Sequence, residues 1–363
     1  MMEGDFNQVI GCMSGTSLDG VDVAALVTNG VEVHEFGPSV FQAYTECQRE
    51  TIRAALGSWP GSRSAQEASL VVTQVHLDAI NGLSIDCPVG FHGQTLNHDP
   101  AHGRTHQTGS PARLAEQLGQ SVVGDFRAAD MEAGGEGAPL APFYHFALAK
   151  HLRITCPVLF LNLGGVANVS WIDPTCTAPE SGAAVLAFDT GPANAPINDL
   201  VHERVGLPFD TNGELAARGD ICSAVLQDFL RNPYFDRQPP KSLDRDTFAM
   251  LLRMVGDLDV SDAAATLTAC AAHAIAAGFR HLPRDVSLIV ACGGGRKNRT
   301  LMKMIADQLT VALTDIDSLG VDGDMLEAQA FGYLAVRCMR HLPTSSPSTT
   351  GCRYPVCGGV IYR

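Results

Sequence analysis

Short apolar runs alternate with polar, Gly-rich loops and with longer stretches of helical periodicity along this chain. Apolar residues run from Val9 to Cys12 and resume at Val21, and a loop of small polar residues lies between them. This pattern predicts a strand, a tight loop and a second strand, which together form a β-hairpin. The same criteria predict a third strand over 31–41 and helices over 45–56 and 64–83.

A similar succession begins again near residue 157. Strands over 157–163 and 166–172 flank the pair Gly164 and Gly165, and a third strand covers 184–188. Helices then alternate with a further strand, as they do in the first half. This recurrence is a weak internal duplication, and it predicts an α/β protein with two related domains that face each other across a cleft.

The other periodic segments complete the expected order of elements. Further strands are expected over 88–91, 122–127 and 286–292, polar loops over 97–104 and 231–245, and helices over 111–118, 142–151, 195–205, 215–230, 263–280, 300–309 and 325–342. The expected organisation is an N-terminal domain over 1–140, a C-terminal domain over 141–342 and a tail over 343–363 that packs back on the body.

Composition narrows the class of protein. The chain has 363 residues, 45% of them hydrophobic and 18% charged, which is enough for two domains with substantial cores. A net charge of −14 argues against nucleic acid as a general partner, because no broad basic face is available. No basic-then-apolar leader and no long apolar run is evident, so we expect a cytoplasmic protein without a membrane partner.

Cysteine and histidine patterns do not indicate a metal centre. The 11 cysteines include no Cys-x-x-Cys pair, which favours buried thiols in a reducing compartment. His98, His102 and His106 are evenly spaced, but a proline and a glycine interrupt any helix that would align them. Cys352 and Cys357 in the tail allow a redox pair or a metal site, but we expect ordinary packing for them.

Four polar, Gly-containing segments come directly after predicted buried strands, at 13–20, 164–168, 189–194 and 293–298. Ligands of α/β sheets bind at such strand ends. Glycines let backbone N–H groups approach phosphates closely, and hydroxyls add further donors. Asp19 and Asp22 are oxygen ligands of the kind that Mg²⁺ prefers. The competing interpretation of the first segment is a Gly/Ser turn at a sheet edge.

Asp189 is the candidate catalytic residue. It follows an apolar strand and precedes Gly-Pro, so its side chain is expected to project from a rigid strand end. Phosphoryl transfer needs a carboxylate that orients the nucleophile and accepts its proton. The alternative is an Asp that caps its own turn.

Several motifs in this chain resemble those of the anhydro-N-acetylmuramic acid kinase family, in the family's order and over nearly the whole chain. They are Met13-Ser-Gly-Thr-Ser-Leu-Asp-Gly-Val-Asp22, His92-Gly-Gln-Thr95 with His98-Asp-Pro100, Asp125-Phe-Arg127 with Gly134-Gly-Glu-Gly-Ala-Pro139, Asn162-Leu-Gly-Gly165 with Asn168-Val169, Phe188-Asp-Thr-Gly-Pro192 with Asn194, and Gly293-Gly-Gly295 with Asn298.

This resemblance implies a fold similar to that of sugar kinases, Hsp70 and actin, with two ribonuclease H-like domains and ATP bound between them. It implies that ATP and water convert 1,6-anhydro-N-acetylmuramic acid to N-acetylmuramic acid 6-phosphate in peptidoglycan recycling. Asp189 would be the general base, deprotonating a water that attacks C1, while O6 takes the γ-phosphoryl group. The attack would have oxocarbenium character.

The resemblance also assigns binding residues. Mg²⁺ would be held near Asp19, through water. The residues implied for ATP are Gly15, Thr16, Ser17, Leu18, Asp19, Gly20, Val21, Asp22, Gly164, Gly165, Gly293, Gly294, Gly295 and Asn298. Those expected on the sugar side are His92, Gln94, Thr95, Arg127 and Glu327.

Two of the sugar-side residues have competing interpretations. Arg127 suits the lactyl carboxylate, because a planar fork matches a planar anion, but a structural ion pair with Asp125 or Asp130 is an equal alternative. Glu327 is either a residue that faces the substrate or part of a solvated helix face.

Two rival functions stay open at this stage. The first keeps the fold and changes the substrate to another 1,6-anhydro sugar such as levoglucosan, which the presence of Arg127 disfavours. The second is a nucleotide-switched binding module without sugar chemistry. The oligomeric state is not predicted, and a homodimer is compatible with the sequence.

Overall fold

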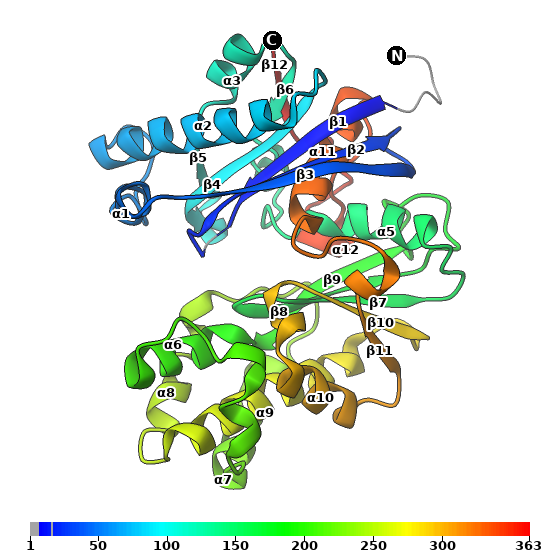
Figure 1. Cartoon of the computed structure of the whole chain (residues 1–363). Coiled ribbons are helices and arrows are strands. Elements are labelled where there is room, and N and C mark those ends of the chain that lie inside the picture. The colour runs from blue at the N-terminus through cyan, green and yellow to red at the C-terminus, as the bar shows by residue number, and fades with distance from the viewer. Residues whose placement is uncertain (1–6, 16) are drawn as a thin grey trace. The chain divides into compact units, whose positions relative to one another are not determined.

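The computed structural model describes residues 7–15 and 17–363, which form two compact units. Unit 1 comprises Met1–Ile154, Cys176–Val185 and Met325–Arg363, and unit 2 comprises Thr155–Thr175 and Leu186–Asp324. Each unit is built around its own β-sheet (Figure 1).

The sheet of unit 1 begins with the predicted hairpin. Strands β1 (Asn7–Ser14) and β2 (Gly20–Thr28) are antiparallel, and β3 (Val33–Ala43) is antiparallel to β2. On the other side of β1, strand β4 (Val89–Asp99) pairs in parallel, and β6 (Val122–Gly124) is parallel to β4. The strand order is β12-β6-β4-β1-β2-β3, and β5 pairs with β4.

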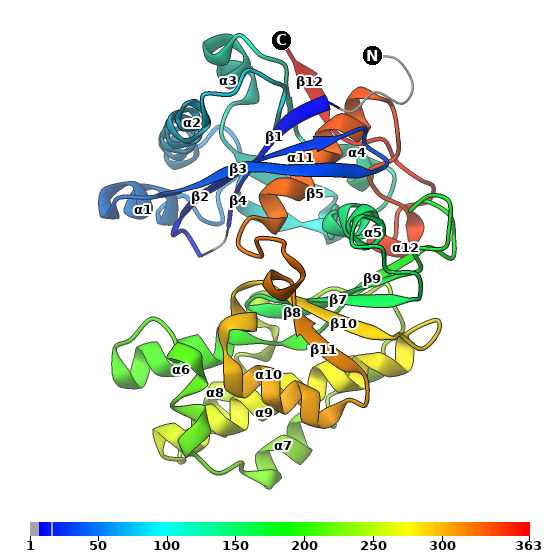
Figure 2. The ribbon, with the colours of Figure 1, turned by 45° about the vertical axis from the view of Figure 1, so that its right-hand side comes forward.

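Two helices of unit 1 cover opposite faces of this sheet, α2 (Arg63–Leu83) and α11 (Leu326–Met339) (Figure 2). Ile10 and Cys12 of β1 share a core cluster with residues of α2. Gly11 between them faces α11, where a Cβ atom on it would lie 1.8 Å from the carbonyl oxygen of Ala328. Successive residues of β1 therefore face opposite sides of the sheet, one side covered by α2 and the other by α11.

Unit 2 repeats this arrangement. Strand β7 (Val158–Leu163) is antiparallel to β8 (Val166–Ile172) and parallel to β10 (Leu288–Cys292). Strand β9 (Val185–Pro192) lies beside β8, and β11 (Ala312–Asp315) is parallel to β10. The order is β11-β10-β7-β8-β9.

Both sheets thus share the order 5-4-1-2-3 when their strands are numbered along the chain and β5, which pairs with β4 off this path, is left out; the C-terminal β12 is added beyond β6 in unit 1. A hairpin-linked trio followed by parallel strands on the far side of the first strand is the ribonuclease H-like topology. The expectation of two related α/β domains of this class is confirmed.

The remaining elements pack around the two sheets. In unit 2, α9 (Val260–Gly278) and α10 (Arg299–Gln308) share a core cluster with β7 and β10. The other helices and strands are α1 (Glu46–Arg53), α3 (Pro111–Leu118), α4 (Ala128–Glu132), α5 (Ala141–His151), α6 (Asn194–Val205), α7 (Ser223–Phe229), α8 (Met250–Met254), α12 (Pro347–Thr350), β5 (Arg104–Thr108) and β12 (Val360–Tyr362).

Several expected elements differ from the structure. The helix expected over 215–230 is broken into a 3₁₀ turn, Ala216–Arg218, and α7, because Gly219 packs so closely on Ser261 that a Cβ atom would lie 2.1 Å from its carbonyl oxygen. Strands β5, β11 and β12 were not expected. The tail forms β12, which pairs antiparallel with β6.

The compact units also differ from the expected boundaries. Helices α5 and α11 were expected in the second domain and lie in unit 1, together with the segment Cys176–Val185. Helix α9 begins the stretch Val260–His281, which is long and apolar enough to cross a membrane; 67% of its most apolar window is buried inside the structure, as in a core helix.

Candidate active-site residues

The loop between β1 and β2 in unit 1 is the first predicted phosphate site. Thr16 lies outside the described residues. Leu18 is buried and adopts φ +56°, and its N–H donates to the Gly15 carbonyl at 3.2 Å. Ser17 and Asp19 are exposed, and the Ser17 hydroxyl donates to Asp19 Oδ1 at 2.7 Å. The loop is a tight turn that presents Ser17 and Asp19 outward.

Two glycines of this loop, Gly15 and Gly20, have different structural roles. Gly15 has open space beside it, with only Ser17 Oγ within 4 Å of a built Cβ atom, so its backbone is accessible to a ligand. Gly20 is instead required by packing, because a Cβ atom there would lie 2.4 Å from the carbonyl oxygen of Gln42. Val21 is fully buried in β2 and Asp22 is half-buried.

The predicted sugar-side residues His92, Gln94 and Thr95 lie inside β4 and not after its end, since the strand continues to Asp99. Gln94 is fully buried and accepts the Ser14 hydroxyl at 2.5 Å, which joins β4 to the base of the hairpin loop. The expected strand over 88–91, which would have ended before these residues, is therefore too short, and all three lie in one strand.

Arg127 and His92 form a fixed pair in unit 1. Arg127 Nε and Nη2 lie 3.1 and 2.9 Å from His92 Nε2, and Arg127 Nη1 donates to the Gly137 carbonyl at 2.7 Å. Desolvation and the positive charge of Arg127 hold the pKa of His92 well below its usual value. His92 is therefore neutral, so Nε2 accepts and Nδ1 donates to the Gly93 carbonyl at 2.9 Å.

Neither ion pair proposed for Arg127 is present among the described residues; no bridge joins it to Asp125 or Asp130. Desolvation lowers the pKa of Arg127 to about 10, so it remains a cation at neutral pH. Glu327 is exposed at the start of α11 and interacts electrostatically with Arg127. The hydrogen-bond partners of Arg127 are thus neutral, while Glu327 and Asp130 act on its charge without a direct contact, so its remaining donors suit an anion.

Three predicted segments meet in unit 2. Asn194 Nδ2 donates to the carbonyls of Leu163 and Gly164 at 2.9 and 2.8 Å. A Cβ atom on Gly293 would lie 2.3 Å from Asn162 Oδ1, and one on Gly295 would lie 2.7 Å from Asn194 Nδ2. The ends of the neighbouring parallel strands β7 and β10 bring these segments together.

Within this cluster, Gly294 has the most open surroundings, followed by Gly164 and Gly165. No atom lies within 4 Å of a built Cβ at Gly294, and none within 3.4 Å at Gly164; the nearest to a Cβ at Gly165 is Ala195 Cβ at 3.4 Å. Asn298 caps α10, because its Oδ1 accepts the Leu301 N–H at 2.9 Å. The glycine segments therefore have room for phosphates. The side-chain oxygen Oδ1 of Asn298 is already hydrogen-bonded to the Leu301 N–H.

Asp189 lies within β9, which runs on to Pro192, so it does not follow the strand as expected. Its Oδ2 accepts the Leu243 N–H at 2.7 Å, its carbonyl accepts the Tyr234 hydroxyl at 2.6 Å, and its N–H donates to the Lys241 carbonyl at 3.0 Å. One partner of the carboxylate, the Leu243 N–H, is therefore distant in sequence, which favours a role beyond the local turn.

Sequence reasoning missed the segment that holds Asp189, since 231–245 was expected to be a polar loop. Lys241 in this segment is 3% exposed, and its ammonium lies 4.6 Å from the centre of the Tyr234 ring. Desolvation, with the charges of Arg237 and Arg280, lowers the pKa of Lys241 to about 8. The only signal in the sequence was a lysine among prolines and aromatic residues.

Arg296 was also missed. It lies just after the glycines, it is buried, and it donates to Asp317 and Asp324 at 2.5 and 2.9 Å and to the Gly293 carbonyl at 3.1 Å. Through these hydrogen bonds, Arg296 connects the Gly-rich turn at Gly293 to Asp317 and Asp324.

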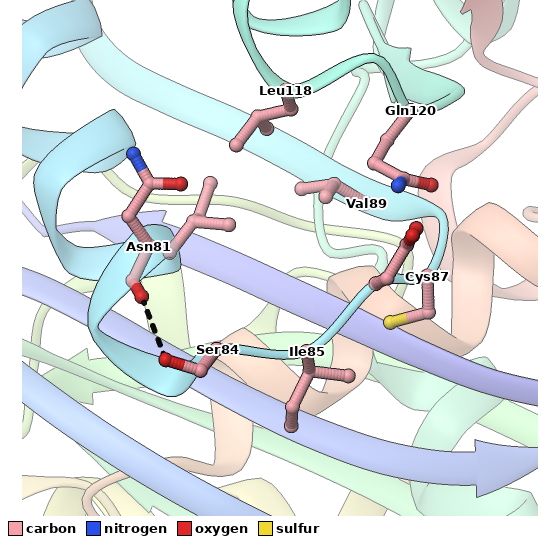
Figure 3. A pocket seen from close by; sticks show the side chains of 9 residues that line it. Asn81, Ser84, Ile85, Cys87, Val89, Leu118 and Gln120 are labelled. Atoms are coloured by element: carbon pink, nitrogen blue, oxygen red, sulfur yellow. Dashed lines mark hydrogen bonds between the residues drawn. The ribbon is translucent and has the colours of Figure 1, made fainter.

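Among the described residues, no group of three or more His, Cys, Asp or Glu side chains could hold a metal ion by itself. A shallow pocket of about 250 Å³ in unit 1 lies elsewhere (Figure 3). Its lining includes none of the predicted site residues and consists of Ile80, Asn81, Ser84, Ile85, Asp86, Cys87, Val89, Leu118 and Gln120.

Comparison with known proteins supplies independent findings. The family model described as anhydro-N-acetylmuramic acid kinase matches residues 7–363. A protein of that name from Cereibacter sphaeroides is 54% identical over 368 residues, covering 100% of this chain and 98% of the relative. One from Roseobacter denitrificans is 50% identical, covering 97% of this chain and 93% of the relative.

Similarity to solved structures is weaker. Component A of (R)-2-hydroxyglutaryl-CoA dehydratase from Acidaminococcus fermentans has a TM-score of 0.43 and 12% identity, covering 91% of this chain and 98% of that chain. A ROK family glucokinase from Streptomyces griseus has a TM-score of 0.39 and 12% identity, covering 90% and 98%.

Proposed function

The chain belongs to the anhydro-N-acetylmuramic acid kinase family, and from that premise we propose how its residues divide the work of the reaction. As a member of this family it is a phosphotransferase that uses ATP and acts on the 1,6-anhydro sugar in peptidoglycan recycling. The observation that carries this conclusion is the family match over residues 7–363.

Asp189 is the general base of the proposed mechanism. It takes a proton from the water that attacks C1, the bond between C1 and O6 breaks, and O6 accepts the γ-phosphoryl group of ATP. The Leu243 N–H at 2.7 Å holds Oδ2 and fixes the orientation of the carboxylate. A base held in one orientation contributes through positioning as well as basicity.

The phosphates of ATP are assigned to the glycine-rich turns that the sequence predicts for them. Open backbone at Gly15, Gly164 and Gly294 fits the close approach of phosphate oxygens to N–H groups. The predicted contacts at Gly165, Gly293 and Gly295 belong to the same turns, that at Thr16 lies outside the described residues, and Asn298 contributes by capping α10.

Mg²⁺ fits the donor set at the hairpin loop. Asp19 is an exposed carboxylate beside the Ser17 hydroxyl, and such a group binds Mg²⁺ through the water ligands that the ion retains. When bound there, Mg²⁺ would supply charge neutralisation at the phosphates.

The sugar is assigned to unit 1. Arg127 pairs with the lactyl carboxylate as a planar fork, while His92 and the Gly137 carbonyl hold the guanidinium. Gln94, Thr95 and Glu327 are assigned to the same side. Arg127 favours anhydro-N-acetylmuramic acid over levoglucosan, which has no carboxylate.

We further propose a cytoplasmic enzyme whose partner is the small sugar, with no nucleic acid or membrane partner. The net charge of −14 supports the exclusion of nucleic acid.

The test measures ADP release from the wild type and from Asp189→Asn with anhydro-N-acetylmuramic acid, with levoglucosan and without sugar. We expect release with the first sugar and a loss of about 10²-fold or more in kcat in the variant. Asp236→Asn is the matched control, because Asp236 is an exposed carboxylate of unit 2 that pairs with Arg280. Release that ignores the sugar would instead indicate a nucleotide-switched module.

A further inference from the structure

Asp130 is a buried carboxylate that joins two segments about 215 residues apart. It is 1% exposed. Its Oδ2 accepts the Gly137 N–H at 2.8 Å, and its Oδ1 accepts the Thr350 hydroxyl at 2.6 Å and the Ser345 hydroxyl. Among the described residues no salt bridge is formed by Asp130, so its direct hydrogen-bond donors are all neutral, and Arg127 acts on it only through longer-range electrostatics.

Backbone bonds hold the same two segments together. The Glu136 N–H donates to the Thr350 carbonyl at 2.8 Å, and the Arg353 N–H donates to the Ala133 carbonyl at 3.0 Å. Residues 350–353 of the C-terminal segment are therefore attached through the backbone to residues 133–136, at the start of the Gly-rich loop. A backbone ladder fixes the distance between the segments, and Asp130 fixes the orientation of the loop.

The residue of this loop that these contacts orient is Gly137, through the peptide groups on either side of its Cα atom. Its N–H faces Asp130, and its carbonyl accepts Arg127 Nη1 at 2.7 Å. Gly137 adopts φ +70°, and a Cβ atom there would lie 2.9 Å from Met131 Cγ, so only glycine suits the position. Arg127 is then held on its other side by His92.

We propose that Asp130, Ser345 and Thr350 are positioning residues for Arg127, so that the C-terminal segment sets the affinity of the enzyme for the carboxylate of its sugar. None of the three is proposed to contact the sugar; each acts through Gly137, whose N–H bonds to Asp130 and whose carbonyl accepts from Arg127. The inference rests on the proposed role of Arg127 as the carboxylate contact.

Buried carboxylates are costly unless every lone pair finds a donor, and donors from separate segments hold them in one place. Removing one donor therefore loosens the loop without removing Arg127 itself. A guanidinium that is held less firmly keeps its positive charge but no longer presents two hydrogen bonds in the geometry that a carboxylate requires. The expected defect is a selective loss of affinity for a sugar that carries a carboxylate.

The test uses Thr350→Val, which removes the hydroxyl at nearly constant volume, with Thr350→Ser as the matched control that keeps it. Calorimetric titration measures Kd for anhydro-N-acetylmuramic acid and for anhydro-N-acetylglucosamine, the same sugar without its lactyl group. We expect Thr350→Val to raise the first Kd by about fivefold and to leave the second unchanged, with kcat and the KM for ATP nearly constant. Thr350→Ser should restore the wild-type Kd.

Combination with Arg127→Ala separates this inference from the proposed function. If Arg127 contacts the carboxylate, Arg127→Ala raises the Kd of the first sugar alone; an unchanged Kd would overturn that role. If Thr350 acts through Arg127, adding Thr350→Val to Arg127→Ala has no further effect. Additive losses, or equal losses for both sugars, would overturn the positioning role even where Arg127 itself is confirmed.

Folding is checked by thermal unfolding of each variant. Ser345→Ala removes the other hydroxyl that donates to Asp130, and it provides a second route if Thr350→Val does not fold. The same selective rise in Kd is expected for Ser345→Ala, and its absence in a folded variant would count against the proposal.

Discussion

Main-chain groups do much of the positioning around Asp189. The Leu243 N–H holds the carboxylate, and the Tyr234 hydroxyl and the Lys241 carbonyl hold the backbone on either side of the same residue. These partners lie 45–54 residues further along the chain. Because backbone donors carry no residue signature, the motif around Asp189 predicts the proposed base but does not reveal the segment that orients it.

Tyr234→Phe tests whether the hydrogen bond from the Tyr234 hydroxyl to the Asp189 backbone helps to position Asp189. Loss of the hydroxyl removes the 2.6 Å hydrogen bond to the Asp189 carbonyl while the ring can remain over Lys241. We expect kcat to fall by about three- to tenfold with little change in either KM, because the base is displaced and not removed.

Tyr354→Phe is the control for this change, since Tyr354 is 58% exposed in the tail of unit 1. Steady-state kinetics with both substrates measures the effect. A rise in the KM for ATP with constant kcat would show that Tyr234 serves binding, and would contradict the assigned role.

At the scale of elements, the packing of α11 on the sheet depends on paired small residues. Gly90 of β4 faces α11, and a Cβ atom there would lie 2.2 Å from the carbonyl oxygen of Phe331. Gly332 of α11 likewise faces Gly11 of β1, with its built Cβ 3.0 Å from the Gly11 nitrogen. A helix can approach a sheet this closely only where both surfaces lack side chains.

Gly90→Ala should therefore destabilise the protein. The methyl group forces α11 away from β4, and overpacking of this kind costs about 2 kcal/mol. Thermal unfolding followed by circular dichroism should show a lower Tm than that of the wild type.

Gly82→Ala is the matched control for Gly90→Ala. Gly82 lies in α2 with no atom within 4 Å of a built Cβ, so the same substitution should stabilise the helix by about 0.5–1 kcal/mol. A Gly90→Ala variant with an unchanged or higher Tm would show that the helix and the sheet have room to separate.

The strands of the two hairpins were predictable because apolar runs stop at small polar loops. The short strands β5, β11 and β12 were not, since their pairing depends on distant partners such as β6 for β12. The extension of β4 and β9 past His92 and Asp189 was also missed. Polar residues inside a strand look like a loop until the neighbouring strands and segments that satisfy them are known.

At the scale of the whole molecule, the candidate residues of each unit lie near corresponding strands. In unit 1 they belong to the β1–β2 loop, to β4 and to the loop after β6; in unit 2 they follow β7 and β10 and include Asp189 of β9. The duplication was visible in the sequence because both halves begin with a Gly-containing hairpin. The return of α11 to unit 1 was not, because small residues on a helix do not reveal which sheet they face.

This division predicts that the two substrates protect different parts of the chain. A non-hydrolysable ATP analogue should slow amide hydrogen exchange at 13–20, 163–165 and 293–298. Anhydro-N-acetylmuramic acid alone should slow exchange at 92–95 and 127–137, where Arg127 and the Gly137 peptide lie. Bound ligands protect the amides that they contact or rigidify, so each footprint reports a separate assignment.

The exposed outer part of α2 is the internal reference for this experiment, because none of the proposed contacts lies there. Peptides from the segment 345–353 give a further readout, since the sugar should slow their exchange if the loop 134–139 transmits order to them through Asp130. Protection of 92–95 and 127–137 by the ATP analogue alone, with none from the sugar, would reverse the assignment of the sugar to unit 1. In that case Arg127 would be a phosphate contact, and discrimination between carboxylate-bearing and plain anhydro sugars would have to come from another residue.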